Sequence, residues 1–240
     1  MEILVNIVSL ILLAMLCYWV SGVIHELGHI LTGLLHGWAF RMLVVGPVGI
    51  KKSENKIKLY IEKDVVMWGG VGAALPTDES ADNIKIWSKV LLGGPIASLA
   101  TGVIFLSLNL FHPSIVFVLL GAMPIAMGIA CLLPLKTGIT YTDGKRWARL
   151  RKQGQSRDEE ICLFRMMMAG LFKKDALTIA LDDFSPLLKA ELPALRYYGN
   201  YYLYQYYSAR NDEENKLKAL ETLDELKKSV PKIIIDDCAL

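Results

Sequence analysis

The chain has 240 residues, a net charge of +2, 53% hydrophobic residues and a mean hydropathy of +0.38. Such a composition is more apolar than that of ordinary soluble proteins and favours a membrane protein, with the lipid bilayer as its surroundings. The small net charge argues against a nucleic-acid partner, and the spacing of the four cysteines does not indicate a disulfide framework.

The first apolar segment, from Ile3 to Leu35, is long enough to cross a bilayer. It lacks a basic amino-terminal region and a small-residue cleavage site, so we do not expect a signal peptide. At ~1.5 Å per residue, a helix from Ile3 to His25 would extend about 33 Å, close to the ~30 Å of a hydrocarbon core. His25 and His29 are therefore expected near the far face of the membrane.

The segment from Arg41 to Lys63 predicts a small membrane-associated β-hairpin. After the turn-like Ser53-Glu54-Asn55, Ile57, Leu59 and Ile61 alternate with polar or amphipathic residues. That period of two is typical of a strand. We expect one edge of this strand to pair with an unwound substrate by β-addition.

The next segment, from Val65 to Leu75, is apolar, interrupted by glycine and too short to cross a bilayer. It predicts a loop on the membrane surface or a re-entrant loop. Its glycines do not have the spacing of a phosphate-binding loop, and no Lys-Ser or Lys-Thr pair follows them. A nucleotide site is therefore not expected.

Two more spans are predicted, from Ile84 to Leu110 and from Ser114 to Leu135, and the short segment between them makes them a helical hairpin. Six Lys and Arg residues lie between Arg41 and Lys63, five lie between Thr142 and Lys152, and none lies between the two spans. The positive-inside rule then predicts an external amino terminus and a cytoplasmic carboxyl-terminal region, in the cell membrane.

The last third of the chain is charged and has helical periodicity. Seven of the ten tyrosines lie between Tyr197 and Tyr207, and their i, i+4 spacing predicts stripes on a helix that pack a small domain rather than stack on a ligand. Helices are expected over four ranges, 156–172, 176–181, 187–210 and 212–230. The predicted fold class is an all-α membrane protein, with a three-span core at residues 1–152 and a cytoplasmic helical domain at 153–240 that could bind a regulatory protein.

The sequence His25-Glu26-Leu27-Gly28-His29 is the strongest chemical signal in the chain. Two histidines at i and i+4 lie one helical turn apart and can bind one Zn²⁺, while Glu26 beside them can act as the general base. Ionisable groups at membrane depth cost ~2.5 kcal/mol or more each, so they are seldom kept without a function. The alternative is a pair of interfacial histidines with Glu26 reaching lipid headgroups.

A catalytic zinc also needs a third protein ligand. Asp143 is the best candidate, because it follows the third span on the side where His25 is expected, and Gly144 would allow a sharp turn that points the carboxylate inward. The alternative is an ordinary surface Asp-Gly turn. His36 and His112 stand alone at the ends of spans, and we expect no metal role for them.

These residues resemble the site-2 protease family of intramembrane metalloproteases. The resemblance rests on the His-Glu-x-x-His sequence, on Gly93-Gly94-Pro95 in the second span, and on Leu132-Leu133-Pro134 followed by Asp143-Gly144. It implies a three-span core in which the two histidines and the later aspartate bind zinc and the glutamate activates water. It also implies a β-hairpin associated with substrate access.

The chain departs from the family pattern at three places. Cys131 stands where the family usually has Asn, the gap between Pro134 and Asp143 is longer, and Ser98 replaces a frequent Asn in the second span. The longer gap bears on the assignment of Asp143, and Ser98 is left without an assigned role.

The sequence therefore predicts a zinc metalloprotease that cleaves a membrane-anchored protein in or near its transmembrane segment. The rival interpretations are an inactive membrane scaffold and a metal-binding component of a transporter. The retained histidines and Glu26 argue against an inactive scaffold, and the scarcity of polar residues in the second and third spans argues against a transporter.

Overall fold

The computed structural model describes residues 2–53, 56–138, 140–172 and 176–238. Two compact units make up the chain, Met1–Leu133 and Pro134–Leu240. Glu54 and Asn55 of the predicted turn lie outside the described residues. The predicted end of the catalytic core at residue 152 is a functional boundary, and it stays a prediction.

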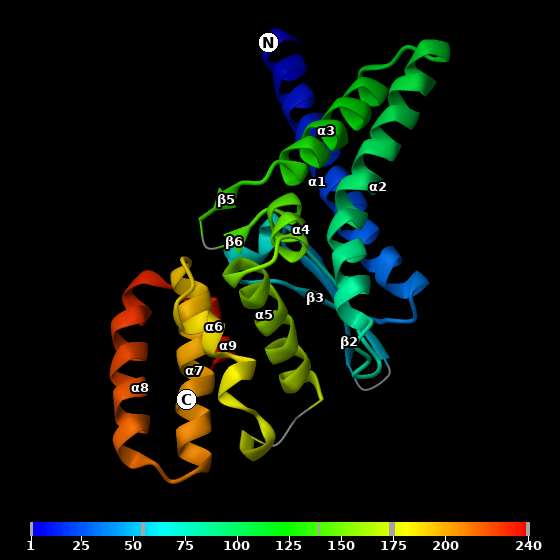
Figure 1. Cartoon of the computed structure of the whole chain (residues 1–240). Helices are drawn as coiled ribbons and strands as arrows, with labels where there is room; N and C mark the ends of the chain where they lie inside the picture. The colour runs from blue at the N-terminus through cyan, green and yellow to red at the C-terminus, as the bar shows by residue number, and fades with distance from the viewer. Residues whose placement is uncertain (1, 54–55, 139, 173–175, 239–240) are drawn as a thin grey trace. The chain divides into compact units, whose positions relative to one another are not determined.

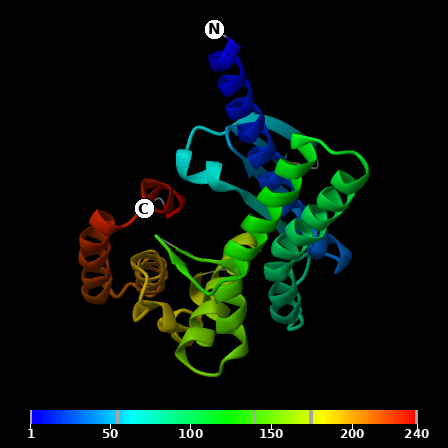
Figure 2. The same cartoon turned by 90° about the horizontal axis from the view of Figure 1, so that it is seen from above.

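Three long helices build the first unit: α1 (Glu2–Leu35), α2 (Asn83–Phe111) and α3 (Ile115–Leu132). All three are long and apolar enough to cross a membrane, and their bounds lie within a few residues of the predicted spans. They pack against one another (Figure 1), and from above they cross close together (Figure 2). The helix α2 continues through Pro95, which is fully buried.

The first unit also contains a four-stranded antiparallel sheet, in the order β3-β2-β1-β4. Its strands are β1 (Ala39–Val45), β2 (Val48–Ser53), β3 (Lys56–Ile61) and β4 (Val71–Leu75), and the 3-10 turn η1 (Val65–Gly69) precedes β4. The segment predicted to form a single hairpin, residues 41–63, therefore holds nearly all of three of the four strands, β1, β2 and β3. The expectation of a surface or re-entrant loop at residues 65–75 is wrong, because residues 71–75 pair with β1 as an edge strand.

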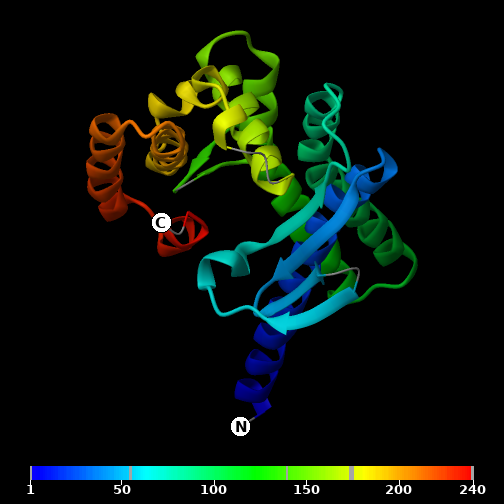
Figure 3. The ribbon, with the colours of Figure 1, turned by 90° about the horizontal axis from the view of Figure 1, so that it is seen from below.

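The sheet lies along the half of α1 that carries the histidines (Figure 3). Trp19 donates its indole N–H to the carbonyl of Val45 at 2.9 Å, which fixes the end of β1 against α1. Gly22, a turn further along α1, leaves room for the side chain of Val45. The strands β1 and β4 therefore pack against α1, and Gly72 of β4 lies against Glu26.

The second unit begins with a short hairpin and is otherwise helical. Its strands and α-helices are β5 (Lys136–Thr137), β6 (Thr140–Tyr141), α4 (Asp143–Arg151), α5 (Gln155–Leu171), α6 (Ser185–Leu188), α7 (Pro193–Ala209), α8 (Glu213–Leu226) and α9 (Lys232–Asp237). Three 3-10 turns join them, η2 (Ala176–Thr178), η3 (Leu181–Asp183) and η4 (Lys227–Ser229). The helix expected from 187 to 210 is divided in two, because Pro193 starts α7.

The tyrosines of α7 pack the interior of this unit. Tyr197 is fully buried, and the rings of Tyr202 and Tyr206 contact the buried Phe184 at centroid distances of 6.4 and 6.0 Å. Tyr202 donates its hydroxyl to the carbonyl of Met166 at 3.1 Å, and burial raises the pKa of Tyr202 to about 12. The tyrosine stripes thus have the packing role that their spacing predicts.

Candidate metal centre

His25 and His29 lie one turn apart on α1, and both are buried, with 5% and 8% of their surface exposed. Their ring centroids are 5.0 Å apart and the rings are nearly perpendicular, at 81°. Buried imidazoles this close together, within the part of a helix packed against both a sheet and another helix, are well placed to bind a single ion.

The tautomer of His29 follows from its hydrogen bond. Its Nδ1 lies 2.7 Å from the carbonyl oxygen of Val90, which can only accept, so Nδ1 carries the proton and donates. The N–H of Gly94 lies 3.3 Å from the same nitrogen, but a nitrogen that donates to Val90 cannot also accept from Gly94. The shorter contact therefore determines the tautomer of His29. In this tautomer the lone pair is on Nε2, the atom with which such a histidine binds zinc.

His25 is oriented by Ser98 of α2. The distance between Nδ1 of His25 and the hydroxyl oxygen of Ser98 is 3.0 Å, and Ser98 is fully buried. A hydroxyl can accept as well as donate, so Ser98 can accept a hydrogen bond from the Nδ1–H of His25, which leaves Nε2 to bind a metal. The sequence pattern pointed to this position without giving it a role, and the structure makes Ser98 the partner of His25.

The glycines of the second span allow this close packing. A Cβ at Gly93 would overlap Gly28 and Thr32 of α1, and a Cβ at Gly94 would overlap the imidazole of His29. The helices can therefore approach closely, with the ring of His29 lying over the backbone of α2. The Gly93-Gly94 pair is explained by this contact rather than by backbone flexibility.

Glu26 is half-buried and contacts β4. A Cβ at Gly70 would lie 2.6 Å from Oε1 of Glu26, and a Cβ at Gly72 would lie 2.9 Å from Oε2. Glycine at both positions thus leaves the space that the carboxylate occupies. The strand with Ile57, Leu59 and Ile61, whose edge is predicted to pair with a substrate, is β3. It forms the edge of the sheet opposite β4, the strand that contacts Glu26.

Asp143 belongs to the second unit, where it is the first residue of α4 and is half-buried. The expected turn at Gly144 is wrong, because Gly144 is helical and Thr142 caps the helix by accepting from the N–H of Lys145 at 3.4 Å. Backbone and hydroxyl of Thr142 also bond to Leu135, at distances from 3.1 to 3.3 Å. These bonds close the base of the β5-β6 hairpin. The additional residues between Pro134 and Asp143 therefore belong to this hairpin.

The helix α4 is fixed to α5 by buried ion pairs. Arg149 donates to Glu160 at 3.1 Å and to Glu159 at 2.5 Å, and Arg146 donates to Glu160 at 3.1 Å. The two glutamates and Arg149 are less than 8% exposed. Such a network holds α4, and with it Asp143, in a fixed orientation within the second unit.

The structure thus brings together His25, Glu26 and His29 with Ser98 in the first unit and places Asp143 in the second. The chemistry of His25, His29 and Asp143 suits a metal ion, since two imidazoles and a carboxylate are common ligands of zinc. His36 is exposed at the end of α1, where its Nδ1 donates to the carbonyl of Thr32 at 2.8 Å.

Comparison with known proteins gives one family. The family model named Peptidase family M50 matches residues 12–234, which is nearly the whole chain and includes both histidines, Glu26 and Asp143. No curated protein and no solved structure matches the chain. The extent of the family match, together with three apolar helices long enough to cross a membrane, shows that the chain belongs to peptidase family M50, the site-2 protease family of membrane metallopeptidases.

Proposed function

We propose that the chain is an intramembrane zinc endopeptidase, which hydrolyses a peptide bond in or near the transmembrane segment of a membrane-anchored protein. The observation that carries the proposal is the pair His25 and His29, held by Ser98 and by the Val90 carbonyl with Glu26 beside them. Histidine ligands of zinc usually have their second nitrogen held by such a partner.

In this proposal His25, His29 and Asp143 hold the zinc ion. The donor atoms are two imidazole nitrogens and one carboxylate oxygen, which is a ligand set of catalytic zinc sites. The support for Asp143 is its chemistry, the family match and its fixed place at the start of α4. When bound, zinc would polarise the substrate carbonyl and make water a stronger nucleophile at neutral pH.

Glu26 is the general base in the proposed mechanism. Its carboxylate accepts a proton from the attacking water and passes it to the leaving amine. Contact with Gly70 and Gly72 limits the positions that the carboxylate can take. The protein thereby holds the proton acceptor in place before the substrate arrives.

We further propose that the substrate pairs with the edge of β4. A helical peptide bond is sheltered by its own hydrogen bonds, so the substrate must unwind, and an unwound segment can add to a sheet edge. β4 is an edge strand of the described sheet and contacts Glu26, which supports this edge over that of β3. A photoreactive residue at Ala73 should crosslink to substrate, and one at Leu59 should not; the reverse pattern contradicts the β4 edge.

The orientation of the chain and its partners remain proposals. The distribution of Lys and Arg supports an external amino terminus, a cytoplasmic helical region and residence in the cell membrane. A reporter protein inserted at His112 should behave as external, and a reporter fused after Leu240 as cytoplasmic. The helical region at 153–240 is proposed to bind a regulatory protein.

The test of the proposed function separates metal binding from proteolysis. Glu26→Gln preserves size and removes the basic carboxylate, so the purified protein should keep zinc and lose cleavage by a factor of about 1,000. His25→Ala and His29→Ala should lose both. The matched control is Glu221→Gln, at an exposed position of α8, which should change neither.

The readouts are the zinc content of the purified proteins and the new peptide termini in membrane proteins of cells that express each variant. Cleavage by Glu26→Gln at the wild-type rate would falsify the role of Glu26. Wild-type protein that binds zinc but generates no new terminus would favour the transporter component. Wild-type protein without zinc would favour the inactive scaffold.

A further inference from the structure

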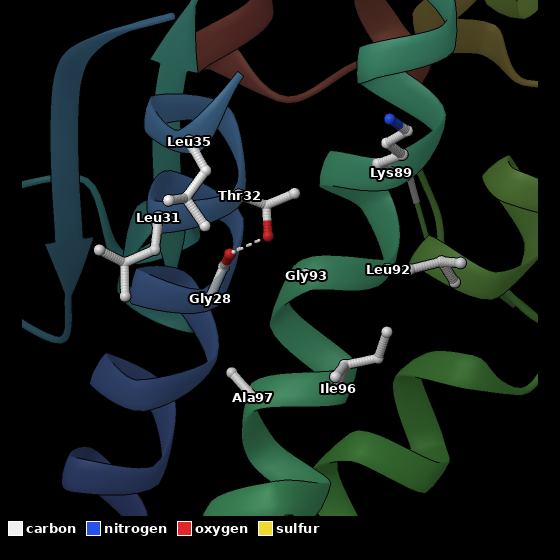
Figure 4. A pocket seen from close by; sticks show the side chains of 9 residues that line it. All are labelled: Gly28, Leu31, Thr32, Leu35, Lys89, Leu92, Gly93, Ile96 and Ala97. Atoms are coloured by element: carbon white, nitrogen blue, oxygen red, sulfur yellow. Dashed lines mark hydrogen bonds between the residues drawn. The ribbon is translucent and has the colours of Figure 1, made fainter. Parts of the chain in front are cut away.

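A groove lies between α1 and α2 outside the metal centre. It has a volume of about 430 Å³ and is open on one side. Nine residues line it, and all are labelled in Figure 4: Gly28, Leu31, Thr32, Leu35, Lys89, Leu92, Gly93, Ile96 and Ala97. Neither the metal ligands nor Glu26 are among them, so the groove is a separate feature of the first unit.

The groove surface is almost entirely apolar. Four side chains on it are leucine or isoleucine, and Leu31 and Ile96 are 55% and 57% exposed. The one hydroxyl, that of Thr32, donates to the carbonyl of Gly28 at 2.8 Å, so this polar atom is satisfied within α1 (Figure 4). Such a surface suits a hydrocarbon chain and offers little to a polar ligand.

A single charge stands at one end of the groove. Lys89 is the charged residue among those that line it, and in the described part of the chain its ammonium donates to Nε2 of His36 at 3.1 Å rather than to a carboxylate. His36 donates from Nδ1 to the carbonyl of Thr32, and its Nε2 accepts the bond from Lys89. The bond to His36 uses one of the three N–H donors of the Lys89 ammonium, so two N–H donors are left for an anion.

The position of Lys89 along α2 places this charge at the membrane surface. The next residues, Val90–Phe111, contain no charged side chain, and at ~1.5 Å per residue they extend about 33 Å. That length matches the ~30 Å hydrocarbon core of a bilayer, so Lys89 lies where the core gives way to the headgroups. Leu92 and Ile96 then lie on the hydrocarbon side.

We propose that this groove binds an anionic phospholipid, with its phosphate at Lys89 and the first part of an acyl chain along Leu31, Leu92 and Ile96. The apolar surface accounts for the acyl chain, and the charge at the headgroup level accounts for the preference for an anion. Gly28 and Gly93 at the base of the groove adjoin His29 and Gly94, so the bound lipid packs beside the helix contact that holds the metal centre.

The test compares lipid retention by full-length variants, and it does not depend on proteolysis. Protein is purified from an equimolar mixture of phosphatidylglycerol and phosphatidylcholine with identical acyl chains, and the bound lipids are counted by native mass spectrometry. Wild type should retain the anionic lipid in excess, and Lys89→Gln should lower that excess about fivefold. The matched control is Lys85→Gln, one turn earlier on α2, where the exposed lysine is paired with Asp82 at 2.9 Å.

A photoreactive residue at Ile96 identifies the occupant directly. A covalent adduct with the mass of phosphatidylglycerol supports the proposal, whereas a protein adduct shows that the groove receives a polypeptide and overturns it. Equal lipid ratios for wild type and Lys89→Gln also overturn it. Circular dichroism of both lysine variants establishes that they remain folded.

Discussion

The two units of the chain bury polar groups in different ways. In the first unit, the buried His25 and His29 each bond through Nδ1 to a neutral oxygen, as histidines that bind a metal through Nε2 usually do. In the second unit, the buried Arg149 is bonded to two carboxylates, so its charge is already balanced. Burial of a polar group alone therefore does not identify a functional site; the chemistry of its partners does.

The outer surfaces of the units differ as well. Leu35 and Ile3 of the first unit are 84% and 77% exposed, as expected where the surroundings are lipid. Phe184 and Tyr197 of the second unit are fully buried, each within a cluster of apolar side chains. The chain thus combines a unit stabilised by close helix packing in lipid with a unit stabilised by an apolar core.

The largest expected effect concerns the space beside Glu26. Gly72→Ala should lower cleavage about 100-fold, because the new Cβ would lie against the carbonyl and carboxylate oxygens of Glu26 and displace this proposed proton acceptor. Zinc content should remain that of the wild type. The measurement is the rate of substrate cleavage together with the metal content of the purified protein.

Gly69→Ala is the matched control for this prediction, since a Cβ at Gly69 would meet nothing within 4 Å. It should cleave at nearly the wild-type rate. Equal activities of the two variants would show that the contact between β4 and Glu26 has no part in the reaction.

A second prediction concerns the closed ion network of the second unit. Glu160→Gln removes the negative charge between Arg146 and Arg149 and should lower the free energy of unfolding by about 2 kcal/mol. Urea unfolding followed by the near-ultraviolet circular dichroism of the tyrosines measures it. The control is the pair of the exposed Glu213 and the half-buried Lys216, and Glu213→Gln should cost less than about 0.5 kcal/mol.

The same network bears on the proposed boundary at residue 152. A chain that ends at Lys152 keeps Arg149 but loses Glu159 and Glu160, so α4 would lose both its ion-pair partners and the helix α5 on which it packs. We expect such a truncation to disturb α4 and weaken zinc binding through Asp143. Retention of full zinc content would show that residues 1–152 form a self-sufficient core.

Much of the first unit follows from the sequence because long apolar runs and the His-Glu-x-x-His spacing are local signals. These local signals alone predicted the bounds of α1 and α2 to within one residue and the pairing of His25 with His29. The strand β4 was missed because Gly70 and Gly72 weaken a strand pattern, and its pairing with β1 is not local. The same two glycines leave room for the carboxylate of Glu26. The residues that weaken the strand pattern in the sequence are therefore part of the candidate site.

The environment of the site could not be predicted for a related reason. Ser98 lies 73 positions from His25, and the Val90 carbonyl carries no side-chain signal at all. The start of α4 was missed because Asp143-Gly144 is typical of a turn, while its cap, Thr142, is fixed by bonds back to Leu135. Sequence patterns thus gave the candidate ligands, and tertiary contacts determine how they are held.

The smallest predicted effect is a change in the free energy of unfolding with pH, and it comes from Cys162. This residue is 3% exposed in the apolar core of the second unit. Burial raises the pKa of its thiol from 9.0 to about 11. The thiol then loses its proton at a lower pH in the unfolded chain than in the folded chain. The contribution of the protonated thiol to stability is therefore fully present below pH 9 and is lost as the pH rises through about 11. Between pH 8 and pH 10 the loss should be about 1 kcal/mol.

Cys162→Ala removes the titrating thiol while keeping an apolar residue, so it isolates this contribution from that of other groups. The variant should be less stable than wild type at pH 8, because it leaves a small cavity, and the difference should narrow by about 1 kcal/mol at pH 10. Tyrosine ionisation cancels in this comparison, since both proteins contain the same tyrosines. Urea midpoints that fall in parallel for the two proteins would show that Cys162 titrates equally in the folded and unfolded chain, and would contradict its burial in a dry core.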